Sequence, residues 1–189
     1  MEAVWSWWPI PSTQRRVLVA HLPHTPSRAE QRALSDRLTC RLFADAGHVV
    51  EADDIGRTIY GKPQLRDSPL HHSISNTRAL SIGVLGPDPI GIDVEALDRP
   101  LRVASDLLTQ RLFASAAEAT VCLQHWTLLQ AWTAKEAVLK AAGLGLGGGL
   151  ANVRIAPDGA AAWLHGSRYA LSLWTQEGFS VAVAEGTRG

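Results

Sequence analysis

Two carboxylates in a strand-like pattern form the first stretch of this sequence that could do chemistry. In residues 89–95, apolar side chains alternate with Gly91, Asp93 and Glu95, which is the period of a strand with one buried face. Asp93 and Glu95 therefore share a face, about 7 Å apart, and Gly91 leaves room beside them. Oxygen ligands favour Mg²⁺ or Mn²⁺ over zinc. The pattern indicates a site for one hard cation.

A second stretch places a carboxylate and an ammonium group on one side of a helix. Residues 125–142 are rich in helix-forming residues and are followed by a glycine that can end a helix. Trp132, Glu136 and Lys140 are spaced four residues apart and share one face, whereas Lys135 points about 100° away. Beside the strand carboxylates, Glu136 could complete a metal site, and Lys140 could reach a phosphate that the metal binds.

Each half of this pattern also has an ordinary structural explanation. Glu136 and Lys140 have the spacing of a helix-stabilising surface pair, and an Asp-x-Glu at a strand end is often a solvated edge. The use of lysine favours chemistry instead. Only three of the 18 basic residues are lysines, at positions 62, 135 and 140, and arginine fills every other basic position. Lysine adds a compact charge on a flexible stem, so its presence there indicates a specific role.

Several short motifs follow one another along the chain. Gly-Ile-Asp-Val-Glu at 91–95 precedes Trp-Thr-Ala-Lys-Glu-Ala-Val-Leu-Lys at 132–140. A Gly-Lys-Pro turn at 61–63, the region of Ser75 and Gly-Leu-Gly-Leu at 143–146 complete the set. This combination resembles the signature of the 4′-phosphopantetheinyl transferases, particularly the Sfp-type group, over about residues 61–146.

The resemblance implies transfer of the 4′-phosphopantetheine group from coenzyme A to a serine of an acyl or peptidyl carrier protein, with release of adenosine 3′,5′-bisphosphate. Asp93, Glu95 and Glu136 would hold Mg²⁺, with Mn²⁺ as an alternative, on the pyrophosphate of coenzyme A. Glu136, directly or through a water, would take the serine proton, and Lys140 would stabilise the departing phosphate. The residues expected to bind coenzyme A are Lys62, Ser75, Asn76, Thr77 and Lys140.

One position departs from the family pattern. The family has Ser-His-Ser where this chain has Ser75-Asn76-Thr77, and the family histidine contacts coenzyme A. Asn76 can donate a neutral hydrogen bond but carries no positive charge. The group that meets the phosphate in its place is therefore open. The candidates are His71, His72 and the arginines of the first predicted helix, Arg28, Arg32, Arg37 and Arg41.

Two other functions fit the same residues. A Mg²⁺-dependent hydrolase would cleave the coenzyme A pyrophosphate with water as the nucleophile. A non-catalytic carrier-binding module would keep the fold with a weakened coenzyme A site. The intact carboxylates and the three lysines favour the transferase. Fatty-acid, polyketide and peptide synthesis all use the same serine chemistry, so the sequence does not select a carrier protein.

The predicted elements must bring these residues together. Ser27 with Glu30 forms a capping box that opens a helix ending near Gly47. Ser115 with Glu118 forms a second capping box, which opens another short helix. An antiparallel meander of short strands up to the motif strand would deliver Lys62, Ser75 and Asp93 to one region. Strands are predicted at 17–22, 57–60, 72–75, 79–85, 152–155, 161–165, 169–174 and 179–184, a further helix at 101–113, and a tight connection at 76–78.

The resemblance also implies the architecture. It predicts an α+β fold of two similar α/β lobes in a pseudo-twofold arrangement, with the active site in the cleft between them. The N-terminal lobe would comprise residues 1–90, and the C-terminal lobe, residues 91–189, would carry the metal and catalytic residues.

The amino-acid composition limits the binding partners and the cellular location that we expect for this protein. The 18 acidic and 18 basic residues balance, which does not indicate a binder of nucleic acid or anionic membranes. Cys40 and Cys122 lie far apart and are expected to be reduced thiols. Neither a signal peptide nor a membrane span is indicated, so a cytoplasmic protein is expected. A monomer is expected because a two-lobed chain would supply both sides of the cleft. The cluster of Trp5, Trp7 and Trp8 is expected to pack against the body of the protein.

Overall fold

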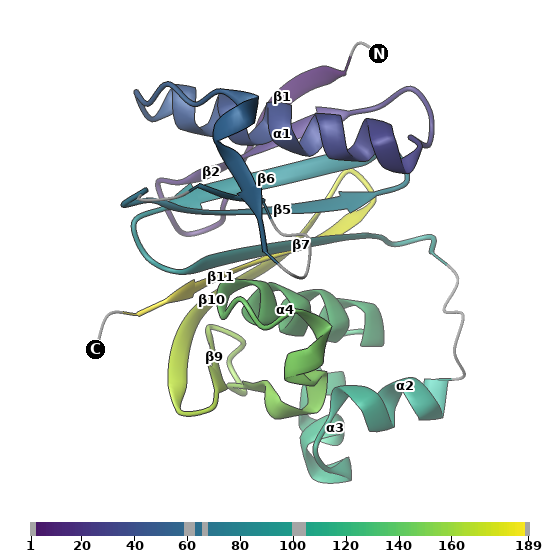
Figure 1. The fold of residues 1–189 in the computed structure, drawn as a ribbon. Coiled ribbons are helices and arrows are strands. Elements are labelled where there is room, and N and C mark those ends of the chain that lie inside the picture. The colour runs from purple at the N-terminus through teal and green to yellow at the C-terminus, as the bar shows by residue number, and fades with distance from the viewer. Residues whose placement is uncertain (1–2, 59–62, 66–67, 100–104, 188–189) are drawn as a thin grey trace.

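The chain folds into stacked layers in the order helix, sheet, sheet, helix (Figure 1). The computed structural model describes residues 3–58, 63–65, 68–99 and 105–187. Within these ranges the structure is a mixed α/β fold of four α-helices and three sheets. This arrangement agrees with the mixed α and β composition predicted from the sequence.

The first sheet lies under the long helix α1 (Arg28–Asp45). Its strands are antiparallel in the order β1 (Val4–Pro9), β2 (Arg16–His21), β6 (Leu80–Gly86) and β5 (His71–Thr77). Leu34, Leu38 and Leu42 of α1 are buried on this sheet, as their helical spacing requires. The predicted connection at 76–78 is shorter than expected, because β5 continues through Thr77 before it turns to β6.

The second sheet begins with the motif strand. Its antiparallel order is β7 (Ile90–Ala96), β11 (Phe179–Gly186), β10 (Ser167–Gln176), β9 (Ala161–Leu164) and β8 (Arg154–Ile155). The predicted meander into the motif strand is wrong, because β7 pairs with β11 and not with β6. A separate small sheet joins β3 (Ile55–Arg57) to β4 (Pro63–Leu65).

The two large sheets share one hydrophobic core. Val17, Val19 and Ile82 of the first sheet face Ile92 and Val181 of the second, and all of these side chains are at most 1 % exposed. Trp8 also lies in this core, whereas Trp5 and Trp7 pack near the leucines of α1. The tryptophan cluster therefore packs against the body of the protein, as predicted.

Helix boundaries follow local capping chemistry. Ser27 and Glu30 form the predicted capping box of α1, and Gly47 after it has a left-handed φ of +82°. The remaining helices are α2 (Ser105–Leu112), α3 (Ala116–Leu123) and α4 (Leu128–Ala141), with short 3₁₀ turns η1 (Ala52–Asp54), η2 (Gly145–Gly148) and η3 (Leu150–Asn152).

The motif helix starts three residues later than predicted. Thr127 caps α4 through a reciprocal capping box with Gln130, which fixes the start at Leu128. Gly143 follows the helix with a left-handed φ of +72°, as expected for a helix end.

Cys40 and Cys122 are free thiols, as expected. None of the described helices is long and apolar enough to cross a membrane.

Candidate functional site

The motif strand and the motif helix approach each other closely at Gly91. A Cβ atom at this position would lie 2.0 Å from the carbonyl oxygen of Ala137 and 2.4 Å from the amide nitrogen of Ala141. Only glycine allows the backbone of α4 to rest on β7 in this way. Because side chains alternate along a strand, Asp93 and Glu95 share the face of Gly91 and project toward the same helix.

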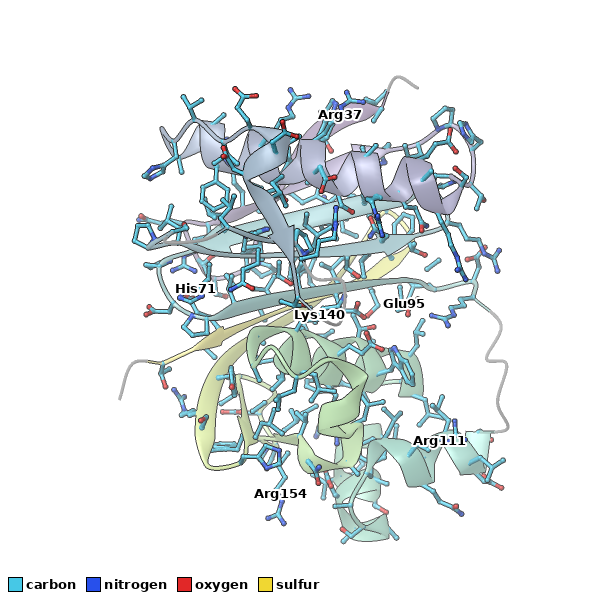
Figure 2. All side chains as sticks on the ribbon, viewed as in Figure 1. Arg37, His71, Glu95, Arg111, Lys140 and Arg154 are labelled. Atoms are coloured by element: carbon cyan, nitrogen blue, oxygen red, sulfur yellow. The ribbon has the colours of Figure 1, made fainter. Side chains whose placement is uncertain are left out.

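The motif helix presents one partly open stripe. Trp132, Glu136 and Lys140 are partly exposed, whereas the residues at 133–135 and 137–139 are buried. The predicted grouping of Trp132, Glu136 and Lys140 on one face is thereby confirmed. Figure 2 shows Lys140 and Glu95 at the junction of β7 and α4.

Lys140 joins the two sheets at the site. Its Nζ donates hydrogen bonds to Asp93 Oδ1 at 2.7 Å and to Ser75 Oγ at 2.8 Å. Ser75 Oγ also donates to Asp93 Oδ1 at 2.7 Å. Ser75 lies on β5 of the first sheet, and Asp93 lies on β7 of the second. A lysine, a serine and an aspartate from three elements thus form one buried polar cluster.

The serines of β5 bridge the edge of the first sheet to β7. The Ser73 Oγ accepts a hydrogen bond from the backbone N–H of Ile92 at 3.2 Å, and Ser75 lies two residues further along the same face. The Ser73 and Ser75 side chains contact β7 through their hydroxyl groups, in place of the backbone hydrogen bonds that join neighbouring strands within a sheet. Ser75 was predicted to bind coenzyme A, whereas Ser73 was not predicted, because its only signal in the sequence is its spacing from Ser75.

Asp93 is the most buried of the three predicted metal ligands. The residue is 3 % exposed, and its Oδ2 atom is buried without a hydrogen-bond partner among the described residues. A buried carboxylate oxygen without a partner is costly unless a cation or a proton meets it. Among the described residues, Asp93 Oδ2 is therefore a buried oxygen that a cation could meet.

The other two carboxylates have raised pKa values. Burial, followed by the negative charge of Asp93, raises the pKa of Glu136 to about 7. Burial also raises the pKa of Glu95, against the opposing effect of its hydrogen bond from Arg99 and with a further rise from Asp93. The three acidic groups therefore influence one another through their charges.

Arg99 is a second cation at the site. Its guanidinium donates a hydrogen bond to Glu95 Oε1 from the next turn of the chain. Arg99 was not predicted as a site residue, although an arginine four residues after Glu95 is a usable signal for such a pair.

The donor chemistry fits Mg²⁺, although the side chains do not surround a single point. Asp93, Glu95 and Glu136 supply only oxygen donors, which suits a hard cation, and Asp93 Oδ2 lacks a partner. In the described ranges, however, no three His, Cys, Asp or Glu side chains are close enough together to hold a metal ion. Lys140 and Arg99 occupy two of the carboxylates instead.

The residues predicted to bind coenzyme A lie mainly at one end of β5. Asn76 is exposed, and its Oδ1 accepts a hydrogen bond from Ser81 Oγ at 2.6 Å. Thr77 is partly buried at the end of the strand. Lys62 lies outside the described residues. His72 is buried with its ring 5.5 Å from that of Phe43, while His71 is exposed.

The third lysine, Lys135, makes buried contacts that connect helices. Lys135 is fully buried, and its Nζ donates to the carbonyl oxygen of Leu112 at 2.5 Å and to Glu118 Oε1 at 2.9 Å. It also lies 4.6 Å from the ring centre of Phe113. This lysine therefore ties α4 to α2 and α3 on the side of the helix away from Glu136.

Comparison with known families identifies the superfamily of the chain. A family model described as the 4′-phosphopantetheinyl transferase superfamily matches residues 89–184, just over half of the chain. The chain therefore belongs to this superfamily, whose general activity is phosphopantetheinyl transfer. The match includes Asp93, Glu95, Glu136 and Lys140, whereas Ser75 and Asn76 lie before it. No curated protein matches the sequence.

Proposed function

We propose that this protein transfers the 4′-phosphopantetheine group from coenzyme A to a serine of an acyl or peptidyl carrier protein. The observation that supports this function best is that three carboxylates and Lys140 lie along the seam between β7 and α4, close enough for their charges to act on one another. This grouping offers oxygen donors for a cation, a carboxyl group that can accept a proton near neutral pH and an ammonium group for a phosphate.

Asp93, Glu95 and Glu136 would hold the cation, Mg²⁺ or Mn²⁺. When bound, this ion supplies neutralisation of charge on the pyrophosphate oxygens. Asp93 is the anchor of the set because it is buried and one of its oxygens has no hydrogen-bond partner among the described residues.

Glu136 is the proposed base. Without a cation, burial and the charge of Asp93 raise its pKa to about 7, and a carboxylate that a bound cation keeps charged can still accept the serine proton. As Glu136 takes the serine proton, the serine oxygen bonds to the phosphorus that carries the pantetheine. The bond from that phosphorus to the bridging oxygen of the pyrophosphate breaks, and adenosine 3′,5′-bisphosphate leaves.

Lys140 is the proposed partner of the leaving phosphate. Its ammonium lies on the partly open stripe of α4 and has a flexible stem that can turn from Asp93 to an incoming phosphate. Ser75, Asn76 and Thr77 would bind coenzyme A from the side of the first sheet, and Lys62 is the further residue expected to bind it.

The finer features taken from the Sfp-type resemblance belong to the same proposal. They comprise two lobes, residues 1–90 and 91–189, related by a pseudo-twofold axis, with the cleft between them as the active site. They also include a monomeric, cytoplasmic enzyme of the holo-carrier-protein synthase type.

Intact mass spectrometry tests this function directly. An apo carrier protein is incubated with the enzyme, coenzyme A and Mg²⁺, and a parallel sample contains EDTA. The carrier should gain one phosphopantetheinyl group, and EDTA should abolish the gain. Free phosphopantetheine without any carrier would instead identify a hydrolase. Carrier binding by calorimetry with no modification of several carriers would identify a binding module.

A further inference from the structure

Lys140 neutralises the carboxylate that the proposed metal ion would use. Its Nζ lies 2.7 Å from Asp93 Oδ1, and the Asp93 side chain is only 4 % exposed. A buried carboxylate needs a counter-charge, and among the described residues no other cation is seen paired with Asp93. Asp93 Oδ1 also accepts a hydrogen bond from Ser75, so this oxygen is already shared by two donors.

Binding a divalent ion and the Lys140 ammonium at Asp93 at the same time would cost electrostatic free energy. Both are cations, and their repulsion a few ångströms apart is strong in a partly buried site, where water screens charges weakly. The cluster already contains two side-chain cations, Lys140 and Arg99, beside the acidic residues Asp93, Glu95 and Glu136. Adding two positive charges would overcompensate this set unless one cation moved away.

Lys140 is the cation that can move. Its side chain is 26 % exposed, whereas that of Asp93 is almost fully buried. The four-carbon stem allows the ammonium to swing while Asp93 stays fixed on β7. The partly exposed stripe of α4 gives the ammonium a path toward solvent.

We propose that Lys140 is a resident counter-cation that competes with the divalent metal ion for Asp93. Lys140 stabilises the metal-free site and weakens metal binding, and metal binding releases its ammonium for the phosphate of coenzyme A. This inference rests on the proposed function only in taking Asp93 as a metal ligand. It makes metal and coenzyme A binding mutually supportive, because the pyrophosphate offers the displaced ammonium a new partner.

Calorimetric titration of Mg²⁺ in the absence of coenzyme A tests the competition. Lys140→Met removes the ammonium and keeps an unbranched side chain. Its affinity for Mg²⁺ should exceed that of the wild type by about tenfold or more, since a close like charge is lost. A lysine that only contacts phosphate would leave this affinity unchanged. Ser75→Ala, which removes a hydrogen bond but no charge, should change the affinity much less.

A matched control separates local competition from overall charge. Arg154→Met makes the same change in net charge on β8, well away from Lys140 (Figure 2), and should bind Mg²⁺ like the wild type. An equal gain in affinity for Arg154→Met would overturn the proposal.

Thermal unfolding provides a second readout. In EDTA, Lys140→Met should melt below the wild type, because Asp93 is left buried without its cation. Mg²⁺ should raise the melting temperature of Lys140→Met more than that of the wild type. Should Lys140→Met not fold, Lys140→Gln replaces it in both measurements.

The outcomes separate this inference from the proposed function. If the wild type binds Mg²⁺ and Lys140→Met binds it equally or more weakly, competition is refuted while the metal site stands. If no protein binds Mg²⁺ at millimolar concentrations, with Asp93→Asn as the reference, both the competition and the metal site at Asp93 are refuted. Carrier modification by mass spectrometry then still decides the transferase activity on its own.

Discussion

Glu136 lies between a buried helix face and a cluster of charged side chains. Its proposed role as a base depends on a carboxyl group that releases and accepts a proton near neutral pH, and its role as a ligand depends on negative charge. Burial and the charge of Asp93 raise its pKa to about 7. A bound cation would lower this pKa again, because it favours the charged form. The state of Glu136 is therefore linked to metal occupancy.

Removal of either central carboxylate should abolish most transfer. Asp93→Ala deletes the buried metal ligand, and Glu136→Ala deletes both a ligand and the base. Loss of a general base typically lowers the reaction rate about 10²–10⁴-fold, and loss of the metal site should lower the rate of transfer further. Carrier modification is followed by intact mass. Near-normal turnover in either variant would show that this site is assigned wrongly.

The stability of the metal-free protein should fall as pH rises toward neutral. Below about pH 4.5 the Glu136 carboxyl is protonated in both the folded and the unfolded chain. Between about pH 4.5 and about 7 the folded chain keeps a proton that the unfolded chain has lost. Folding is then opposed by ionisation, so the free energy of unfolding falls across this range and levels off above it. The raised pKa of Glu95 acts in the same direction.

Urea unfolding in EDTA at several pH values measures this slope. Glu136→Gln, which cannot ionise, should flatten the pH dependence and should be the more stable protein above pH 7. An unchanged slope in Glu136→Gln would show that the pKa of Glu136 is not raised in the folded chain.

At the scale of elements, the contact of α4 with β7 sets the site. Gly91→Ala would place a methyl group 2.0 Å from the carbonyl oxygen of Ala137, so the helix must move off the strand. Overpacking of this kind costs about 1–3 kcal/mol or more, and transfer activity should fall because Glu136 and Lys140 move with the helix.

The matched control is Gly147→Ala, where an added Cβ meets nothing within 4 Å. Its unfolding free energy and its activity should stay close to those of the wild type. If Gly91→Ala behaved like Gly147→Ala, the close approach of strand and helix would be contradicted.

Lys135 fixes the opposite side of the same helix. Lys135→Met would leave Glu118 without its cationic partner and the Leu112 carbonyl oxygen without the Lys135 donor. Breaking a buried pair in this way costs about 3 kcal/mol, somewhat less where the carboxylate is partly exposed. The urea midpoint should fall, and the double variant Lys135→Met, Glu118→Gln should recover part of the loss. An unchanged midpoint for Lys135→Met would show that this lysine does not hold α4.

At the scale of the whole molecule, the core between the sheets makes the two halves interdependent. Ile82 of the first sheet is fully buried against residues of the second. Ile82→Ala should destabilise the protein by about 2–5 kcal/mol and should do so in one cooperative transition. Tryptophan fluorescence and circular dichroism should give the same midpoint. Two separated transitions would show that the two sheets unfold independently.

Much of the site is determined by local sequence. The period of two in residues 89–95 placed Asp93 and Glu95 on one face, and the four-residue spacing placed Trp132, Glu136 and Lys140 on one side of a helix. Capping by Ser27 with Glu30, and Gly143 after the motif helix, set helix ends. These features depend only on residues a few positions apart, so one chain is enough to predict them.

The tertiary structure decided how these pieces meet. The sequence predicted that β7 would continue a meander, but its partner is β11, almost ninety residues later. Lys140 was expected to contact a phosphate, but its Nζ donates a hydrogen bond to Asp93, 47 residues away. The raised pKa of Glu136 likewise comes from burial and from charges on other elements. Such pairings depend on which surfaces pack together across long separations in sequence, and local periodicity carries no information about that choice.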